Sequence, residues 1–154
     1  MKKQATSRMC FVCGESNPGG VRVRFYEQED GSLLARFTGA DHHQGYPGRM
    51  HGGVITAIMD ETMGRAIMIT HGEAIWGVTA ELSVRFRKPV PLGIELIAIG
   101  RIISEKSRTF EGAGKLYLPD GSVAVEGSGK YVKLDISRIA DFDAEREQWY
   151  IRPD

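Results

Sequence analysis

Residues 49–65 read RMHGGVITAIMDETMGR, and this stretch decides the fold of the chain. It reads as one helix that begins with two glycines, Gly52 and Gly53, which let another group approach the first free backbone N–H donors closely. Asp60 and Glu61 then interrupt a largely apolar run. A helix that is apolar nearly all round is buried, and a buried carboxylate is costly unless it is paired or functional. The stretch therefore combines an anion-favouring helix N-terminus with acids two turns further on.

The segments on both sides of this helix have the patterns of β-strands. Before it, residues 21–25 and 33–37 flank a turn and predict a hairpin. After the helix, which we expect to run from about Gly52 to Thr70, short turns separate the strands of an antiparallel meander. These strands are expected over residues 75–87, 94–103, 107–118 and 122–134. One long helix and one sheet of about six strands predict an α+β domain with the sheet curled round the helix.

The first strand after the helix shows two faces. Its apolar face comprises Val78, Ala80, Leu82, Val84 and Phe86, and its polar face comprises Thr79, Glu81, Ser83, Arg85 and Arg87. Because successive side chains of a strand point to opposite faces, we expect Thr79 and Leu82 on opposite sides of the sheet.

The bulk properties fit one ordinary domain, residues 1–154, with its core at about 10–134. Residues 135–154 read as a C-terminal tail with room for a short helix around 141–149, and residues 1–9 are expected to fray. The formal net charge is zero, so nothing points to nucleic acid or to an anionic membrane. The apolar runs are too short to span a bilayer and no secretory signal is expected, so a cytoplasmic location follows by default.

Two cysteines, Cys10 and Cys13, form a C-x-x-C motif. A redox role needs this motif at a strand-to-helix junction, whereas here glycines and a proline follow it and place it in a turn. A zinc site needs two more ligands, which His42 and His43 supply only if the fold brings them close. The favoured interpretation is a pair of reduced thiols packed in an N-terminal turn, with no metal and no cofactor.

Two segments carry a resemblance to a known family. Residues 45–53 (GYPGRMHGG) running into Asp60-Glu61, and residues 78–93 (VTAELSVRFRKPVPLG), resemble the hotdog-fold acyl-CoA thioesterases of the PaaI-like branch. The resemblance covers roughly residues 10–134, and it implies the hotdog fold, an antiparallel sheet wrapped round one long central helix. It is more specific for the fold than for catalysis, because some hotdog relatives bind acyl groups without cleaving them.

The resemblance also implies roles for individual residues. The backbone N–H of Gly52 would polarise the thioester carbonyl, and Asp60 would attack that carbonyl or activate water. His51 would help to place the acyl carbonyl, and Thr79 would help to hold the water. Many relatives carry an Asn six residues before the histidine, a position where this chain has glycine, so Gln44 beside it is the candidate for the missing amide.

Further residues are candidates for substrate binding. Gly53 lies beside Gly52 at the start of the helix, where backbone N–H groups favour an anion. A basic cluster follows on the next strand, made of Arg85, Arg87 and Lys88. This cluster suits the phosphates of coenzyme A, and a solvated strand edge is an equally good interpretation.

The spacing within the helix has a geometric consequence. Gly52 and Asp60 are eight residues apart, which is about 12 Å along a helix, so one carbonyl cannot touch both. If both act, they come from different chains, as two antiparallel helices across a two-fold axis would allow. We therefore predict an obligate homodimer, with further pairing into a homotetramer left open.

The two adjacent acids differ in their helical neighbours. Glu61 has Arg65 four residues on, the spacing of an ion pair, whereas Asp60 has no cation at helical spacing. An acid without a cation in an apolar place is the better general base. Asp60 is therefore ranked ahead of Glu61 as the catalytic carboxylate.

These observations favour an enzyme that hydrolyses an acyl-CoA thioester to the free acid and coenzyme A. Thioester hydrolysis needs donors where the carbonyl oxygen becomes negative and a nucleophile or base at the carbonyl carbon, and the stretch offers both. The alternative is a hotdog protein that binds or senses acyl-CoA without cleaving it. A hotdog hydratase ranks third, because its usual histidine and acid on one helix are not clear here.

Overall fold

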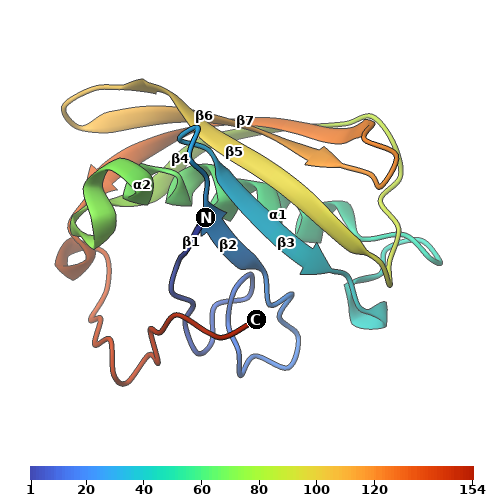
Figure 1. Cartoon of the computed structure of the whole chain (residues 1–154), viewed down its shortest axis with the longest axis horizontal. Helices are drawn as coiled ribbons and strands as arrows, with labels where there is room; N and C mark the ends of the chain where they lie inside the picture. Colours follow the sequence, from blue (N-terminus) through green and yellow to red (C-terminus); the bar gives the residue numbers. More distant parts are fainter.

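The computed structural model describes residues 1–154 and shows one curved antiparallel sheet wrapped round a helix (Figure 1). The sheet has seven strands in the order β1-β2-β3-β5-β6-β7-β4. Their bounds are β1 Lys2–Lys3, β2 Arg24–Glu27, β3 Leu33–Thr38, β4 Trp76–Phe86, β5 Glu95–Glu105, β6 Thr109–Tyr117 and β7 Val123–Leu134. The predicted α+β hotdog architecture is confirmed, with the two-residue β1 added at one edge.

The central helix is shorter than expected because it is interrupted. Helix α1 covers Gly52–Arg65, and a separate short helix, α2, covers Ile67–His71. At Ala66 the hydrogen bonding tightens, since its N–H bonds to the carbonyl of Met63, three residues back, instead of four. Gly72, with a φ of 60°, then ends α2. None of the helices has the length and apolar character that crossing a membrane requires.

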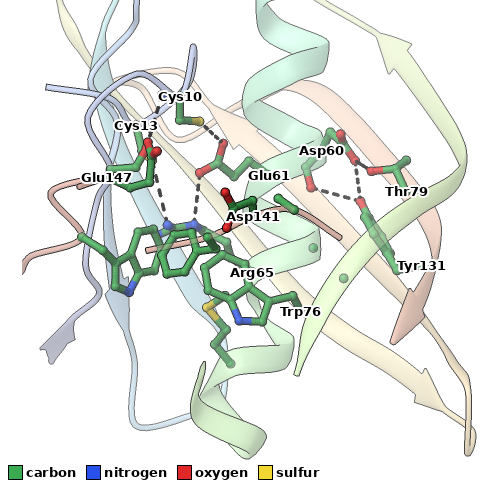
Figure 2. A pocket seen from close by; sticks show the side chains of 17 residues that line it. Cys10, Cys13, Asp60, Glu61, Arg65, Trp76, Thr79, Tyr131, Asp141 and Glu147 are labelled. Carbon is green, nitrogen blue, oxygen red and sulfur yellow. Dashed lines mark hydrogen bonds and ion pairs between the residues drawn. The ribbon is translucent and has the colours of Figure 1, made fainter. Parts of the chain in front are cut away.

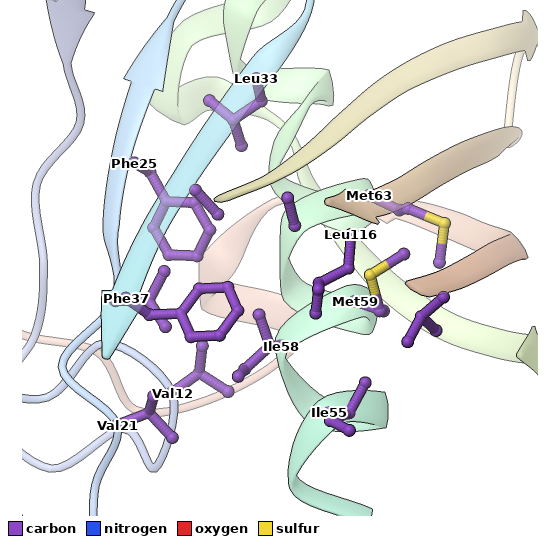
Figure 3. Close-up of a cluster of buried hydrophobic side chains, with 14 of the residues drawn as sticks. Val12, Val21, Phe25, Leu33, Phe37, Ile55, Ile58, Met59, Met63 and Leu116 are labelled. Carbon is purple, nitrogen blue, oxygen red and sulfur yellow. The ribbon is translucent and has the colours of Figure 1, made fainter. Parts of the chain in front are cut away.

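The hydrophobic core lies between α1 and the concave face of the sheet (Figure 3). It consists of fully buried side chains from both layers, among them Phe25, Leu33, Ile58, Met59, Met63 and Leu116. Met50 and Met68 are buried as well, and Met68 also lines the cavity described below. A close approach of sheet and helix is possible because several sheet positions facing the helix are glycines. At Gly100, for example, a Cβ would lie 2.8 Å from the carbonyl oxygen of Thr62.

Strand β4 corrects the expected alternation of its side chains. A β-bulge between Thr79 and Glu81 leaves Ala80 as the extra residue, opposite no residue of β7. The extra residue shifts the parity, so Thr79 and Leu82, expected on opposite sides, both face the helix. The bulge therefore lets Thr79 face α1 together with Leu82. In a regular strand these two residues, three positions apart, would lie on opposite faces.

The two ends of the chain are ordered against each other. Residues 1–9, which we expected to fray, include β1 and the buried Gln4 and Thr6, and an isolated bridge pairs Thr6 with Tyr150. The fraying prediction was wrong because strand β2 pairs with residues 2–4 and the C-terminal tail supplies backbone partners to Thr6 and Arg8. Residues 144–148 form turns instead of the short helix expected at 141–149, and Gln148 has a φ of 50°, outside the range of a right-handed helix. The one helical segment of the tail is a 3-10 helix at Ile136–Arg138.

Candidate active site

Asp60 points from the middle of α1 towards the sheet, where two hydroxyl groups meet it (Figure 2). The Thr79 hydroxyl donates a hydrogen bond to Asp60 Oδ1 at 2.8 Å. The Tyr131 hydroxyl lies 3.1 Å from the same oxygen and 3.1 Å from the backbone carbonyl oxygen of Asp60. The expected apolar surroundings of Asp60 are therefore wrong in detail, because two neutral donors hold one of its oxygens in place.

The pairing of two strands creates this arrangement. Thr79 and Tyr131 are directly opposite each other in the β4–β7 ladder, so their side chains lie on the same face. Tyr131 is packed against Gly64, where a Cβ would come within 3.0 Å of the ring, and it stacks on Phe110. Burial and the nearby charge of Asp60 raise the pKa of Tyr131, so the phenol stays protonated and donates. Sequence reasoning did not find Tyr131, because only the register of the sheet brings it to Asp60.

Glu61 points to the other side of α1, towards residues 10–20, here called the N-terminal knuckle (Figure 2). Its Oε1 accepts from Arg65 Nε at 3.1 Å, which confirms the ion pair that the spacing predicts. Its Oε2 accepts from the Cys10 thiol at 3.2 Å. Arg65 is buried and also donates to the carbonyl of Ala5 at 3.0 Å. Glu61 thus links helix and knuckle, a different role from that of Asp60.

The titration properties on this side follow from burial and coupling. Burial and the neighbouring Cys13 raise the pKa of Glu61 to about 8. The neighbouring thiol of Cys10 and the positive charge of Arg65 lower the pKa of Cys13 to about 5. The thiols are reduced, as expected for a knuckle, but they contact a carboxylate and a guanidinium instead of apolar packing alone.

A cavity of about 450 Å³ connects the two acids. It is lined by Asp60 with its hydroxyl partners, by Glu61 with its thiol and guanidinium partners, and by aromatic side chains of the tail. The ring of Trp76 packs at a tilt against those of Phe142 and Trp149, with centroids 5.5 and 5.1 Å apart, so the tail forms one wall. The size and the mixture of apolar and polar walls are typical of a small-molecule site.

The N-terminus of α1 is a second, separate feature. His51 is the N-cap, and its Nδ1 accepts from the N–H of Gly53 at 2.9 Å, so that donor is occupied. The N–H of Gly52 has no acceptor within the chain, and His51, Gly52 and Gly53 are all exposed. Gln44 accepts from the N–H of Gly48 at 3.0 Å and so braces the preceding turn. A free backbone donor therefore faces solvent at the positive end of the helix.

The remaining candidates lie away from the cavity. Arg87 forms ion pairs with Glu126 at 2.9 Å, and Arg85 is exposed on the outer face of β4. Lys88 lines a shallow surface pocket together with Arg49, a cation that the sequence reasoning did not single out. The basic cluster is thus divided between a solvated strand edge and a two-cation pocket.

Neither loop histidine joins the site. His43 is buried, where its Nδ1 accepts from the Ala40 N–H at 3.0 Å and its Nε2 contacts the Gly19 carbonyl at 2.8 Å. His42 is exposed and packs on His43 with ring centroids 4.1 Å apart. The fold does not bring either histidine to the cysteines. His43 forms its hydrogen bond to the knuckle at the carbonyl of Gly19, and the metal-ligand group that contains both cysteines includes no histidine.

Comparison with known proteins places the chain in a family. The model of the thioesterase superfamily matches residues 47–125, which contain α1 and strands β4 to β6. The chain belongs to the thioesterase superfamily. The matched residues include both ends of α1 and Thr79, whereas the knuckle, the loop residues 42–44, Tyr131 and the tail lie outside them.

Relatives and solved structures agree with this assignment. Acyl-coenzyme A thioesterase THEM4 of Mus musculus is 29% identical over 79% of the chain, and the match spans 51% of that protein, so the chain spans about half the length of this relative. A solved thioesterase superfamily protein, RHA08564, is 33% identical with a TM-score of 0.74, over 81% of this chain and 63% of that one. Protein BH2602 from Bacillus halodurans, solved with CoA, has a TM-score of 0.67 at 24% identity over 75% and 76% of the two chains, and shows a shared fold.

Proposed function

We propose that the chain hydrolyses acyl-CoA thioesters to a free acid and coenzyme A. The observation that carries the proposal is Asp60, a carboxylate held by two hydroxyls in the wall of a cavity of about 450 Å³. Family membership supports thioester chemistry, and the relative from mouse is named an acyl-CoA thioesterase. The cytoplasmic location expected from the sequence stays a prediction.

The proposed reaction uses the two features of α1 in different ways. The thioester carbonyl oxygen accepts from the Gly52 N–H, where the helix dipole stabilises the negative charge that develops. Asp60 either takes the proton of an attacking water or attacks the carbonyl carbon itself, and in both routes the thiolate of coenzyme A leaves. After direct attack, water cleaves the anhydride between the acyl group and Asp60 and releases the free acid. Thr79 and Tyr131 hold Oδ1 of Asp60, which leaves Oδ2 for the reaction. Lys88 and Arg49 are candidates for the phosphates of coenzyme A.

The site is proposed to be shared between two protomers. Within one chain the Gly52 N–H faces solvent and does not line the cavity that contains Asp60. Strand β4 is an edge strand of 11 residues, and Phe86 beside Gly52 is 50% exposed, so an apolar and hydrogen-bonding edge is available to a second copy. A two-fold pair would place Gly52 of each chain near Asp60 of the other.

A thiol-release assay over short, long and aromatic acyl-CoAs tests the reaction. We expect turnover with at least one substrate and a loss of about 10²–10⁴-fold in kcat for Asp60→Asn. Asp41→Asn is the matched control, since Asp41 is an exposed acid outside the cavity and should leave the rate unchanged. Acyl-CoA binding without any thiol release would refute hydrolysis and favour the non-catalytic alternative.

Subunit complementation tests the shared site. Gly52→Pro removes one N–H at the first helical position, where proline is tolerated, and His51 with φ −62° and ψ 135° already has the backbone that precedes proline. Gly52→Ala keeps the N–H and adds a Cβ at an ordinary 3.5 Å from Phe86, so it is the control for bulk.

Gly52→Pro and Asp60→Asn should each be inactive as homodimers. A purified heterodimer of the two has one intact site, so it should recover on the order of half of the wild-type activity. A heterodimer as inactive as its parents would show that both groups act within one chain.

A further inference from the structure

The knuckle and α1 bring three metal-ligand side chains together on the side of the helix that the proposed reaction does not use. The Sγ atoms of Cys10 and Cys13 and a carboxylate oxygen of Glu61 all lie within 4.8 Å of one another. Cys10 Sγ is 3.2 Å from Oε2 of Glu61, while the other oxygen of Glu61 contacts Arg65. The carboxylate therefore turns one oxygen towards the thiols and keeps the other for its ion pair.

The contact of 3.2 Å and the limit of 4.8 Å bracket the ligand separations of a tetrahedral zinc ion. Zinc binds thiolates at about 2.3 Å and carboxylate oxygens at about 2.0–2.2 Å, so neighbouring ligand atoms of a tetrahedron are about 3.5–3.8 Å apart. The C-x-x-C spacing is one that zinc knuckles use. The tight turn is built into the knuckle, since the Gly14 N–H bonds to the Cys10 carbonyl at 2.7 Å and a Cβ at Gly14 would lie 2.4 Å from that oxygen.

The charges around the cluster favour a dication. The cavity walls carry four carboxylate side chains, Asp60, Glu61, Asp141 and Glu147, against the single guanidinium of Arg65. With both thiols ionised, the three ligands contribute three negative charges, of which Arg65 offsets one. A zinc ion offsets the remaining two, so the metal-bound cluster carries no net charge.

We propose that Cys10, Cys13 and Glu61 bind a zinc ion that fastens the N-terminal knuckle to α1, with the fourth position open to the cavity. Binding releases the thiol protons, because zinc binds the thiolate form. The sequence reasoning set a metal aside because it found only the two cysteines and the two loop histidines. The fold supplies Glu61 as the third ligand, from a position 48 residues beyond Cys13.

A dithiol–disulfide couple is the competing interpretation of the same pair. A redox-active C-x-x-C places its attacking thiol, exposed, at the start of a helix. Here the motif lies in a turn with no helix after it, Cys13 is 1% exposed, and the Cys10 thiol is directed at a carboxylate. A carboxylate can take the proton of a thiol in either case, so the missing helix and the burial of Cys13 are what favour the metal site.

Metal content of the full-length reduced protein tests the proposal. After incubation with zinc and gel filtration in metal-free buffer, we expect about one zinc per chain by mass spectrometry. Glu61→Gln and Cys10→Ser should weaken zinc binding by more than about 100-fold, which exceeds the 10–100-fold typical when only a partner of a metal ligand is lost. Glu147→Gln is the matched control, because it removes one charge from the same cavity but lies outside the cluster, and it should retain the metal.

Two measurements on the unaltered protein keep the test independent of the folding of variants. Cobalt in place of zinc should give the thiolate-to-metal charge-transfer absorption of a tetrahedral site, and zinc should protect both thiols from alkylation until a chelator is added. Reduced protein that retains no zinc, shows no such absorption and alkylates equally with and without zinc would overturn the proposal. Zinc retention that Glu61→Gln leaves unchanged would overturn it too.

Discussion

The adjacent acids Asp60 and Glu61 lie on different sides of α1, and their side chains share no contact partner. Asp60 faces the sheet and receives hydrogen bonds from the hydroxyls of Thr79 and Tyr131. Glu61 faces the knuckle and contacts the thiol of Cys10 and the guanidinium of Arg65. One residue along a helix is a rotation of about 100°, so adjacent acids are directed to separate layers of the molecule.

This difference teaches how one short sequence can serve two purposes. Neutral hydroxyls orient Asp60 without cancelling its charge, which suits an acid that must act on a substrate. The guanidinium of Arg65 and the thiol of Cys10 occupy one oxygen of Glu61 each, which suits a carboxylate that connects structural elements or binds a metal. The predictions that follow are designed to separate these two roles, beginning with the largest expected effect.

The comparison is sharpest in the kinetics of two isosteric variants. Asp60→Asn should lower kcat by about 10²–10⁴-fold, because the amide cannot act as nucleophile or base. Glu61→Gln should lower kcat by at most about tenfold, since it disturbs α1 only through Arg65 and Cys10. Steady-state thiol release of both variants, measured side by side after removal of metal, gives the ratio of their two kcat values. Equal losses would contradict the separation of roles.

Contacts between α1 and the knuckle should contribute more to the free energy of unfolding, whereas contacts between Asp60 and the sheet should contribute more to kcat. Arg65→Met removes a cation that is 6% exposed, leaves Glu61 without its ion pair and leaves the Ala5 carbonyl without its donor. We expect a loss of about 3–5 kcal/mol in the free energy of unfolding, measured by urea denaturation. Arg146→Met is the control, because Arg146 is 54% exposed and its ion pairs should contribute less than about 1 kcal/mol. A comparable loss in both variants would argue against a special role of Arg65.

The sequence predicted most of the fold and only part of the site, for a physical reason that individual residues illustrate. Periodicity and turn residues act over a few positions, so they located the strands and the start of α1 well. The ion pair between Glu61 and Arg65 is also local, at helical spacing, and was predicted correctly. The bulge at Ala80 has no such local signal, and it reversed the face on which Thr79 lies relative to Leu82.

Contacts between distant segments were beyond the sequence. Tyr131 reaches Asp60 across 71 positions, and Cys10 reaches Glu61 across 51. Both contacts depend on the register of β7 and on the path of the knuckle, which no pattern of neighbouring residues specifies. The alternating run around Tyr131 indicates a strand, and a tyrosine on its buried face is the only hint that a hydroxyl needs a partner there.

Thr79 tests whether the hydroxyls orient Asp60. Thr79→Val keeps the shape of the side chain and removes a donor to a charged group, an interaction worth about 1.5–3 kcal/mol. We expect kcat to fall by at least about tenfold, with little change in the apparent KM. Thr79→Ser keeps the donor and should restore most of the rate. If the serine variant is as slow as the valine variant, packing of the β4 bulge matters more than the hydrogen bond.

The smallest effect is expected at Tyr131, whose single proton is divided between two acceptors on Asp60. Tyr131→Phe keeps the ring stacked on Phe110 and against Gly64, so the fold should lose only about 0.5–1.5 kcal/mol of unfolding free energy. The rate should fall less than in Thr79→Val, because Thr79 still holds Oδ1. In the double variant both donors are lost. Its free-energy penalty should exceed the sum of the penalties of the two single variants if one hydroxyl compensates for the loss of the other. Strict additivity in this cycle would show that the two hydroxyls act on Asp60 independently.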